Sequence, residues 1–240
     1  MRLPKVHGII RRRLLVNFRI DPDAVQARLP APFRPKVHGG YAVGGICLIR
    51  LEGIRPKRFP EMFGLSSENA AHRFAVTWTD ADGEHEGVYI PRRDSGSLLN
   101  TLAGGRLFPG EHHRARFVVT DDGGRVALEM RSADQAVSVS VSGSATDALP
   151  PGSIFASVRE ASDFFEPGSI GYSATSAGHK LDGIELRTQN WEVQPLRVES
   201  VQSSYFDDRS LFPSESIRFD CALVMRNIAH EWHAAAEMYV

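Results

Sequence analysis

The stretch Arg114-Ala115-Arg116-Phe117-Val118-Val119-Thr120-Asp121-Asp122-Gly123-Gly124-Arg125-Val126-Ala127-Leu128-Glu129-Met130-Arg131 decides the fold class of this chain. It contains two runs rich in apolar residues, 114–120 and 125–131, on either side of two aspartates and two glycines. Such runs around an Asp/Gly turn are typical of a β-hairpin. The stretch is therefore predicted to form two antiparallel strands.

Strand patterns of the same kind fill most of the chain. A second hairpin is predicted from 71–79 and 86–91, around Asp80-Ala81-Asp82-Gly83. The glycine pair Gly44-Gly45 allows another backbone to approach closely. Further strands are predicted where Val, Ile and Leu dominate or alternate with polar residues: 12–20, 41–51, 136–144, 184–187, 193–206 and 217–225.

Three short helices interrupt the strands. The first follows Asp21-Pro22-Asp23, which supplies an N-cap and a proline at the first helical position, and runs through Leu29. The second is predicted over about 95–102. The third begins at Ser157, where Ser157 and Glu160 have the spacing of a capping box.

These patterns predict a mainly β protein with a few short helices, an α+β fold. We expect one domain over 1–240, because the sequence has no internal repeat and no linker. An open sheet of so many strands would leave exposed edges, so a closed antiparallel β-barrel is the expected architecture. The loop over 52–66, rich in Pro and Arg, is long enough to suggest a function.

Composition excludes several classes of partner. The formal net charge of the 240 residues is −1, which predicts no binding to nucleic acid or to an anionic membrane. No segment approaches the ~20 apolar residues of a membrane helix, and no secretory signal is visible. The two cysteines, Cys47 and Cys221, lie in predicted buried strands and are expected to be reduced core residues of a cytoplasmic protein.

The pair His112-His113 opens the strand of the first hairpin. Neighbouring strand residues point to opposite faces, so only one of the two should face the interior. That imidazole would be a general acid or base, or would donate to a substrate carboxylate. The alternative is a structural histidine that binds a backbone carbonyl at the rim of the barrel.

Other polar clusters give weaker signals. In Arg92-Arg93-Asp94-Ser95, Asp94 or Ser95 would cap the second helix, and the free amides there could meet an anion. Arg106 either completes an anion pocket near the histidines or pairs with Glu111. His230-Glu231-Trp232-His233 lacks the i, i+4 histidine spacing of a helical zinc motif, so no metal site is expected.

Several segments together resemble a known group of proteins. The chain resembles an uncharacterised bacterial family grouped with the acetoacetate decarboxylase superfamily. The resemblance covers most of the chain and follows the family's order. The segments that carry it are 12–35, 67–76, 99–117, Leu181-Asp182-Gly183-Ile184-Glu185-Leu186-Arg187 through Val198-Glu199-Ser200, and 219–233.

This resemblance implies a cone-like antiparallel β-barrel with an interior pocket, in a homo-oligomer. In the decarboxylases a lysine forms an imine with a β-keto acid, next to a second lysine, an arginine and a glutamate. By motif, the glutamate falls on Glu68, the arginine on Arg11 or Arg12, and the lysine pair on His112 and His113. Imidazole cannot form an imine, which needs a primary amine. The chain's four lysines, Lys5, Lys36, Lys57 and Lys180, all lie outside this segment.

Two functions fit these residues. The first is an enzyme that holds a small carboxylate-bearing molecule, such as a keto acid, and acts by acid–base catalysis without an imine. Glu68, His112 and His113 are its catalytic candidates, and Arg11, Arg12 and Arg106 are its substrate-binding candidates. A decarboxylase-like lyase, a hydratase or a tautomerase reaction would be equally open. The second is a non-catalytic barrel that keeps the pocket for a small molecule and has lost the chemistry together with the lysines. Separately, Glu68 could be an exposed loop carboxylate, and Arg11 a surface arginine of its strand. Neither function calls for a cofactor.

Overall fold

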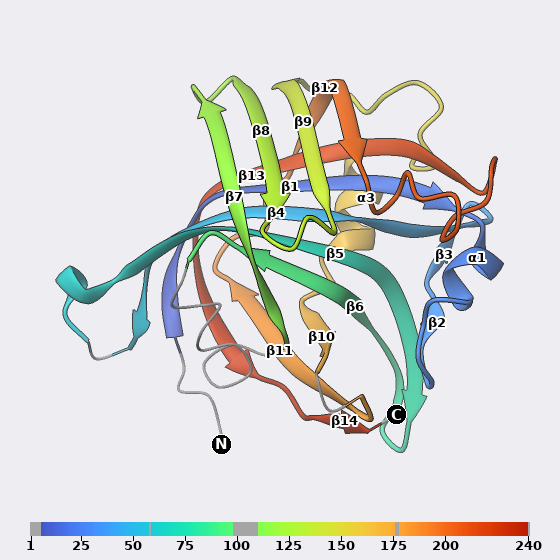
Figure 1. Cartoon of the computed structure of the whole chain (residues 1–240), viewed down its shortest axis with the longest axis horizontal. Coiled ribbons are helices and arrows are strands. Elements are labelled where there is room, and N and C mark those ends of the chain that lie inside the picture. The colour runs from blue at the N-terminus through green and yellow to red at the C-terminus, as the bar shows by residue number, and fades with distance from the viewer. Residues whose placement is uncertain (1–5, 58, 98–109, 176–177, 240) are drawn as a thin grey trace.

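Long β-strands make up most of the chain, as the sequence predicts (Figure 1). The computed structural model describes residues 6–57, 59–97, 110–175 and 178–239. The strands are β1 (Val6–Ile20), β2 (Arg34–Pro35), β3 (Val37–His38), β4 (Tyr41–Pro56), β5 (Leu65–Asp80), β6 (Gly83–Ser95), β7 (His112–Asp121), β8 (Arg125–Ser132), β9 (Ser138–Ala145), β10 (Ile170–Ala174), β11 (Lys180–Thr188), β12 (Gln194–Ser203), β13 (Ile217–Ala234) and β14 (Met238–Tyr239). The helices are α1 (Pro22–Gln26) and α3 (Val158–Phe165), with one 3-10 turn, η1 (Glu61–Phe63).

A central sheet of five strands, in the order β13-β1-β4-β5-β6, is shared by two halves of the molecule. In one half the pairings run from β6 through β7, β8, β9 and β12 back to β13. In the other half they run from β6 through β10 and β11 back to β13. Figure 1 shows these two sets of strands on opposite sides of the central strands. The pairings thus form two rings of strands that share the central sheet.

The strand pairings are mostly antiparallel, as expected, and the two parallel ones both involve β6. This strand pairs in parallel with β7 on one side and with β10 on the other. Parallel neighbours need a long crossover connection, unlike the two-residue turn of a hairpin. The chain supplies one between Ser95 and His112, and a longer one before Ile170.

Each face of the central sheet packs against its own hydrophobic core. Alternate residues of β1 divide between the two: Leu14 and Val16 pack with Leu128 of β8 on one face. Leu15 packs on the other face with Phe164 and Phe165 of α3. Because successive side chains of a strand point to opposite faces, a strand buried on both sides reads as a continuous apolar run.

Both predicted hairpins are confirmed. β5 and β6 pair up to Asp80 and Gly83, and β7 and β8 pair from Asp121 and Val126 onward. The expected loop over 52–66 is shorter in the structure, because β4 continues to Pro56 and β5 already begins at Leu65.

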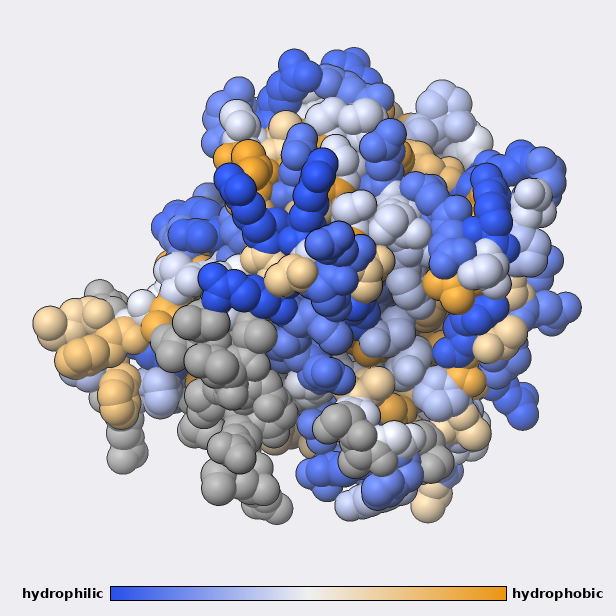
Figure 2. All heavy atoms as spheres, in the orientation of Figure 1, coloured by the Kyte–Doolittle hydropathy of each residue, from blue (hydrophilic) through white to orange (hydrophobic). Residues whose placement is uncertain are grey.

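The tip between β4 and β5 projects from the body and carries apolar side chains (Figure 2). Phe59, Met62 and Phe63 are all more than half exposed there. They form the most prominent group of exposed large apolar residues in the described part of the chain.

Two of the three expected helices are present with the predicted caps. The Asp21 carboxylate accepts a hydrogen bond from the Asp23 amide at 2.8 Å, and the Ser157 hydroxyl accepts one from the Glu160 amide at 3.1 Å. The first helix ends at Gln26 rather than Leu29. Ser95 is the last residue of β6 and does not begin a helix. The rest of that predicted helix, from residue 98, lies outside the described residues.

Cys47 and Cys221 are buried and not bonded to each other, as expected of core thiols. Within the described ranges, no helix combines the length and the apolar character that crossing a membrane requires.

The glycine pair on β4 generates a stability prediction. A Cβ on Gly45 would overlap the Val16 carbonyl oxygen of β1, so Gly45→Ala should lower the free energy of unfolding by about 1–3 kcal/mol, measured by urea denaturation. Gly124→Ala is the matched control, since its Cβ would meet only Asp122 Oδ1 at 3.7 Å, and it should change stability by less than about 0.5 kcal/mol. Equal stabilities of the two variants would contradict the close approach of β1 to β4.

Candidate functional site

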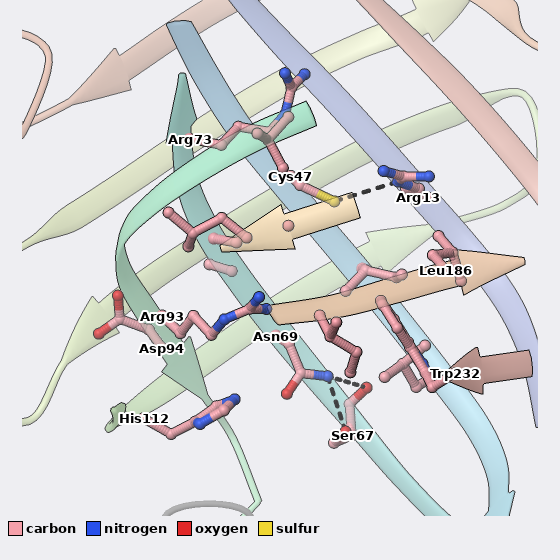
Figure 3. A pocket seen from close by; sticks show the side chains of 18 of the residues that line it. Arg13, Cys47, Ser67, Asn69, Arg73, Arg93, Asp94, His112, Leu186 and Trp232 are labelled. Carbon is pink, nitrogen blue, oxygen red and sulfur yellow. Dashed lines mark hydrogen bonds between the residues drawn. The ribbon is translucent and has the colours of Figure 1, made fainter. Parts of the chain in front are cut away.

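A pocket lies against the face of the central sheet that also faces β10 and β11 (Figure 3). Its volume is about 110 Å³, which is room for a small organic acid or several water molecules. Most of its wall is apolar, from β4, β5, β6, β11 and β13: Ile49, Leu51, Ile54, Leu65, Ala70, Ala71, Val88, Ile90, Ile184, Leu186 and Trp232. Its polar lining is Arg13, Cys47, Ser67, Asn69, Arg73, Arg93, Asp94 and His112, with Ser169.

Alternation along β5 decides which of its polar residues reach the pocket. Ser67, Asn69 and Arg73 line it, whereas Glu68 lies between them on the other face. The Glu68 carboxylate accepts a hydrogen bond from Arg12 Nη2 at 2.6 Å. Glu68 lines a separate, more open groove beside Arg114 and Arg116 of β7. The neutral amide of Asn69 therefore lines the pocket, and the neighbouring carboxylate of Glu68, the predicted catalytic group, does not.

The arginines of β1 are separated in the same way. Arg13 lines the pocket. Arg12 is buried on the opposite face, where it pairs with Glu68 and with Asp121. Arg11 is 53% exposed and pairs with Glu52. The pairing of β1 with β4 shifts register between Ile10 and Arg12, which places Arg11 at a bulge. Neither Arg11 nor Arg12 lines the pocket, and the third arginine of the run does.

His112 faces the pocket and His113 does not, which agrees with the predicted alternation. His113 Nδ1 lies 3.3 Å from an Asp134 carboxylate oxygen. His112 Nδ1 lies 3.3 Å from the Gly110 carbonyl oxygen. A carbonyl only accepts, so we assign the proton to Nδ1 and the lone pair to Nε2. Burial, with Arg93 as the next cause, lowers the pKa of His112 to about 4, so the ring is neutral at pH 7.

Three arginines from three strands line this one pocket. Arg73 of β5 donates to Asn17 Oδ1 at 2.7 Å and lies over the Phe165 ring at 5.2 Å. Arg93 of β6 donates to Ser173 Oγ at 2.8 Å. Arg13 donates to Cys47 Sγ at 3.3 Å. Burial lowers the pKa of Arg73 and of Arg93 to about 10 in each case.

No carboxylate of the described residues forms an ion pair with any of these three arginines. The carboxylate of Asp94, the acidic residue of the lining, binds Arg92 instead, at 2.9 Å, and Figure 3 shows Asp94 pointing away from Arg93. The pocket is therefore apolar in its walls and positive in charge, which is the environment that binds a small anion.

The lysines of the described part lie elsewhere. Lys57 pairs with Glu231, and Lys180 with Asp182 and Glu237. Lys36 borders a smaller adjoining pocket of about 30 Å³, which also borders Arg13 and Arg73. Its Nζ donates to Glu86 at 2.6 Å and to the Phe164 carbonyl at 3.1 Å. Lys5 and Arg106 lie outside the described residues.

The structure places the other residues that the sequence offered as capping or metal-binding candidates on strands. Asp94 and Ser95 belong to β6, so Asp94 does not cap a helix. His230 and His233 lie on β13, where His230 is buried and His233 Nε2 lies 2.9 Å from Glu231. Among the described residues, no three His, Cys, Asp or Glu side chains are grouped so that they could hold a metal ion.

Arg73 and Arg13 were not identified as site residues from the sequence. Arg73 had a readable signal: on its face of β5 it stands between Ala71 and Ala75, while the other face carries Phe74, Val76 and Trp78. Small residues around a charge in an otherwise bulky strand indicate a hollow. The sequence did not show which of the three consecutive arginines faces the pocket, because the bulge in β1 decides it.

The fold is that of acetoacetate decarboxylase-like proteins. The chain is similar to an acetoacetate decarboxylase-like enzyme from Sphingomonas wittichii RW1, with a TM-score of 0.63 and 13% identity over 100% of this chain and 94% of that one. It is similar to acetoacetate decarboxylase from Legionella pneumophila, with a TM-score of 0.64 and 12% identity over 99% and 88% of the two chains. The enduracididine biosynthesis enzyme MppR in complex with pyruvate gives a TM-score of 0.62 and 9% identity over 100% and 91%.

Residues 9–221 match the DUF2071 family, described as an uncharacterized conserved protein. The chain belongs to this family. No curated protein matches its sequence.

The buried state of His112 generates a prediction on pH. Its folded pKa of about 4 lies below the ordinary 6.5, so the unfolded chain takes up the proton first as the pH falls. The neutral ring's contribution to stability is present above pH 6.5 and is lost progressively down to about pH 4. His112→Gln should therefore show a smaller fall in its urea midpoint than the wild type between pH 6.5 and pH 4.5. Parallel curves for the two proteins would contradict a neutral, buried His112.

Proposed function

We propose that the pocket binds a small organic acid, of the keto-acid class, through its carboxylate. One observation carries this proposal: Arg13, Arg73 and Arg93 line one largely apolar pocket and have no acidic partner in the described chain. Burying a guanidinium without a counter-charge is unfavourable, and a bound carboxylate would supply the missing charge and acceptors. A protein of the same fold binds pyruvate, which supports a keto acid as the ligand.

The chemistry we propose needs no imine. None of the described lysines lines this pocket, and Lys36 forms an ion pair with Glu86. The His112 ring would act as the acid–base group: Nε2 would take a proton from the carbon next to the ketone, and a guanidinium would stabilise the enolate oxygen. This step is shared by lyases, hydratases and tautomerases. Glu68 and His113 point away from this pocket, so we give them no part in the step.

The competing proposal is a barrel that binds the acid and does not convert it. The low pKa of His112 favours this alternative, since a base with a pKa of about 4 is weak at neutral pH. Turnover of a bound keto acid, followed by NMR of its α-carbon protons in D₂O, separates the two: exchange that is lost in His112→Gln indicates catalysis.

Arg93 provides the test of binding. Pyruvate and acetoacetate should each raise the Tm of the wild type in proportion to the logarithm of their concentration. Arg93→Gln should bind about 10- to 100-fold more weakly, since a charge-assisted hydrogen bond contributes about 1.5–3 kcal/mol. Without ligand it should be at least as stable as the wild type, because the buried unpaired charge is gone.

Arg187→Gln is the matched control, since Arg187 is 59% exposed and pairs with Glu185 on the surface of β11. It should bind both acids as the wild type does. Equal affinities of Arg93→Gln and Arg187→Gln would contradict the assignment of the pocket.

Reduction with borohydride tests the absence of an imine. The protein incubated with acetoacetate and borohydride should keep its mass, because the pocket offers no primary amine in its described lining. The intact mass would be measured by mass spectrometry and any adduct mapped by peptide digestion. An adduct on Lys36, the lysine of the adjoining pocket, would overturn the proposed mechanism.

A further inference from the structure

Cys47 stands in the wall of the same pocket and has no role in the proposed function. It lies on β4, where its sulfur points toward Arg13 (Figure 3). The other cysteine, Cys221 on β13, is fully buried. Burial raises the pKa of the Cys221 thiol far above its ordinary value, so that thiol is unreactive.

One cation contacts the Cys47 sulfur, and two more line the same pocket. Arg13 Nε donates a hydrogen bond to it at 3.3 Å. Arg73 and Arg93 line the same pocket as Cys47, and charge on this sulfur would raise the pKa of both guanidiniums. Cys47 is buried, with 8% of its surface exposed, but it borders the pocket. Reactive cysteines occur in electropositive surroundings, whereas structural cysteines lie among apolar groups.

Two guanidinium nitrogens of the arginines beside Cys47 lack a hydrogen-bond acceptor in the described part of the chain, which indicates a site for a ligand. Arg13 Nη1 and Arg73 Nε are both buried and have no hydrogen-bond partner within the described residues. Arg73 is 96% removed from solvent, with 4% of its surface exposed. A buried donor without an acceptor is costly, and an anion bound beside Cys47 would bring such acceptors.

We propose that Cys47 is a nucleophile directed at electrophiles that carry a carboxylate. The arginines would hold the carboxylate, and the sulfur would attack the neighbouring carbon. With a 2-haloacid, the S–C bond forms, the carbon–halogen bond breaks, halide leaves and the thiol proton goes to solvent. With an α,β-unsaturated acid, the sulfur adds to the β-carbon and the thiol proton ends on the α-carbon. This proposal rests on the anion binding proposed above and adds a covalent step to it.

Alkylation of the native protein tests the proposal directly. Iodoacetate and iodoacetamide differ in charge and place the same reactive carbon next to a carboxylate or an amide. The labelling rate of each reagent at Cys47 would be measured by mass spectrometry of the Cys47 peptide. The ratio of the iodoacetate rate to the iodoacetamide rate should be about tenfold or more higher in the native protein than in the urea-unfolded protein. The reason is that a cleft of one charge concentrates ions of the other. Cys221 should stay unmodified in the native protein, and Cys47→Ser should take up no label.

The arginine variants show whether the cations cause the preference. Arg13→Gln should bring the ratio back toward that of the unfolded chain, while Arg187→Gln should leave it unchanged. Native protein that is not labelled at Cys47, or that shows the unfolded ratio there, would overturn the proposal.

Labelling of Cys47 in the presence of pyruvate distinguishes a failure of this proposal from a failure of the proposed function. It should slow labelling of Cys47 at concentrations that raise the Tm. Pyruvate binding without any labelling of Cys47 overturns the nucleophile alone. Preferential labelling by iodoacetate without pyruvate binding supports the nucleophile and overturns the keto-acid assignment.

Discussion

The alternation of side chains across the central sheet is the constraint on which the rest of the structure depends. The five strands β13, β1, β4, β5 and β6 are buried on both faces. Successive residues of each strand therefore point alternately into the core on one face and into the core on the other. On one face these residues make a solid core with β8, β9 and β12. On the other face their packing against β10, β11 and α3 leaves a space, which is the pocket. A shift of one residue therefore moves a side chain from the pocket to the opposite core.

Electrostatics distinguishes the two faces as clearly as packing does. On the face of the solid core, Arg12 is neutralised by Glu68 and Asp121, and Asp121 also binds Arg226. On the pocket face, Arg13, Arg73 and Arg93 bind only neutral acceptors: a thiol sulfur, an amide oxygen and a hydroxyl. A folded chain tolerates such an imbalance when function requires it. Both the proposed anion site and the proposed nucleophile derive from this difference.

Much of the fold could be predicted because its signals are local. The two hairpins around 80–83 and 121–124, and the caps Asp21 and Ser157, depend on residues within a few positions of one another. The parallel pairings of β6 could not be predicted, since they join strands across long connections. The alternation at His112 and His113 was predictable, and which of the two faces the pocket was decided by the pairing of β7 with β6.

The sequence by itself determined the β-rich class, the two hairpins and the two helix caps, because each depends on neighbouring residues. Only the tertiary structure decided which arginines gather. Arg13, Arg73 and Arg93 come from three strands, and the bulge in β1 turns Arg11 outward while register places Asn69, and not Glu68, at the pocket. The physical reason is that a site built across strands depends on register, and register is set by the packing of the whole sheet.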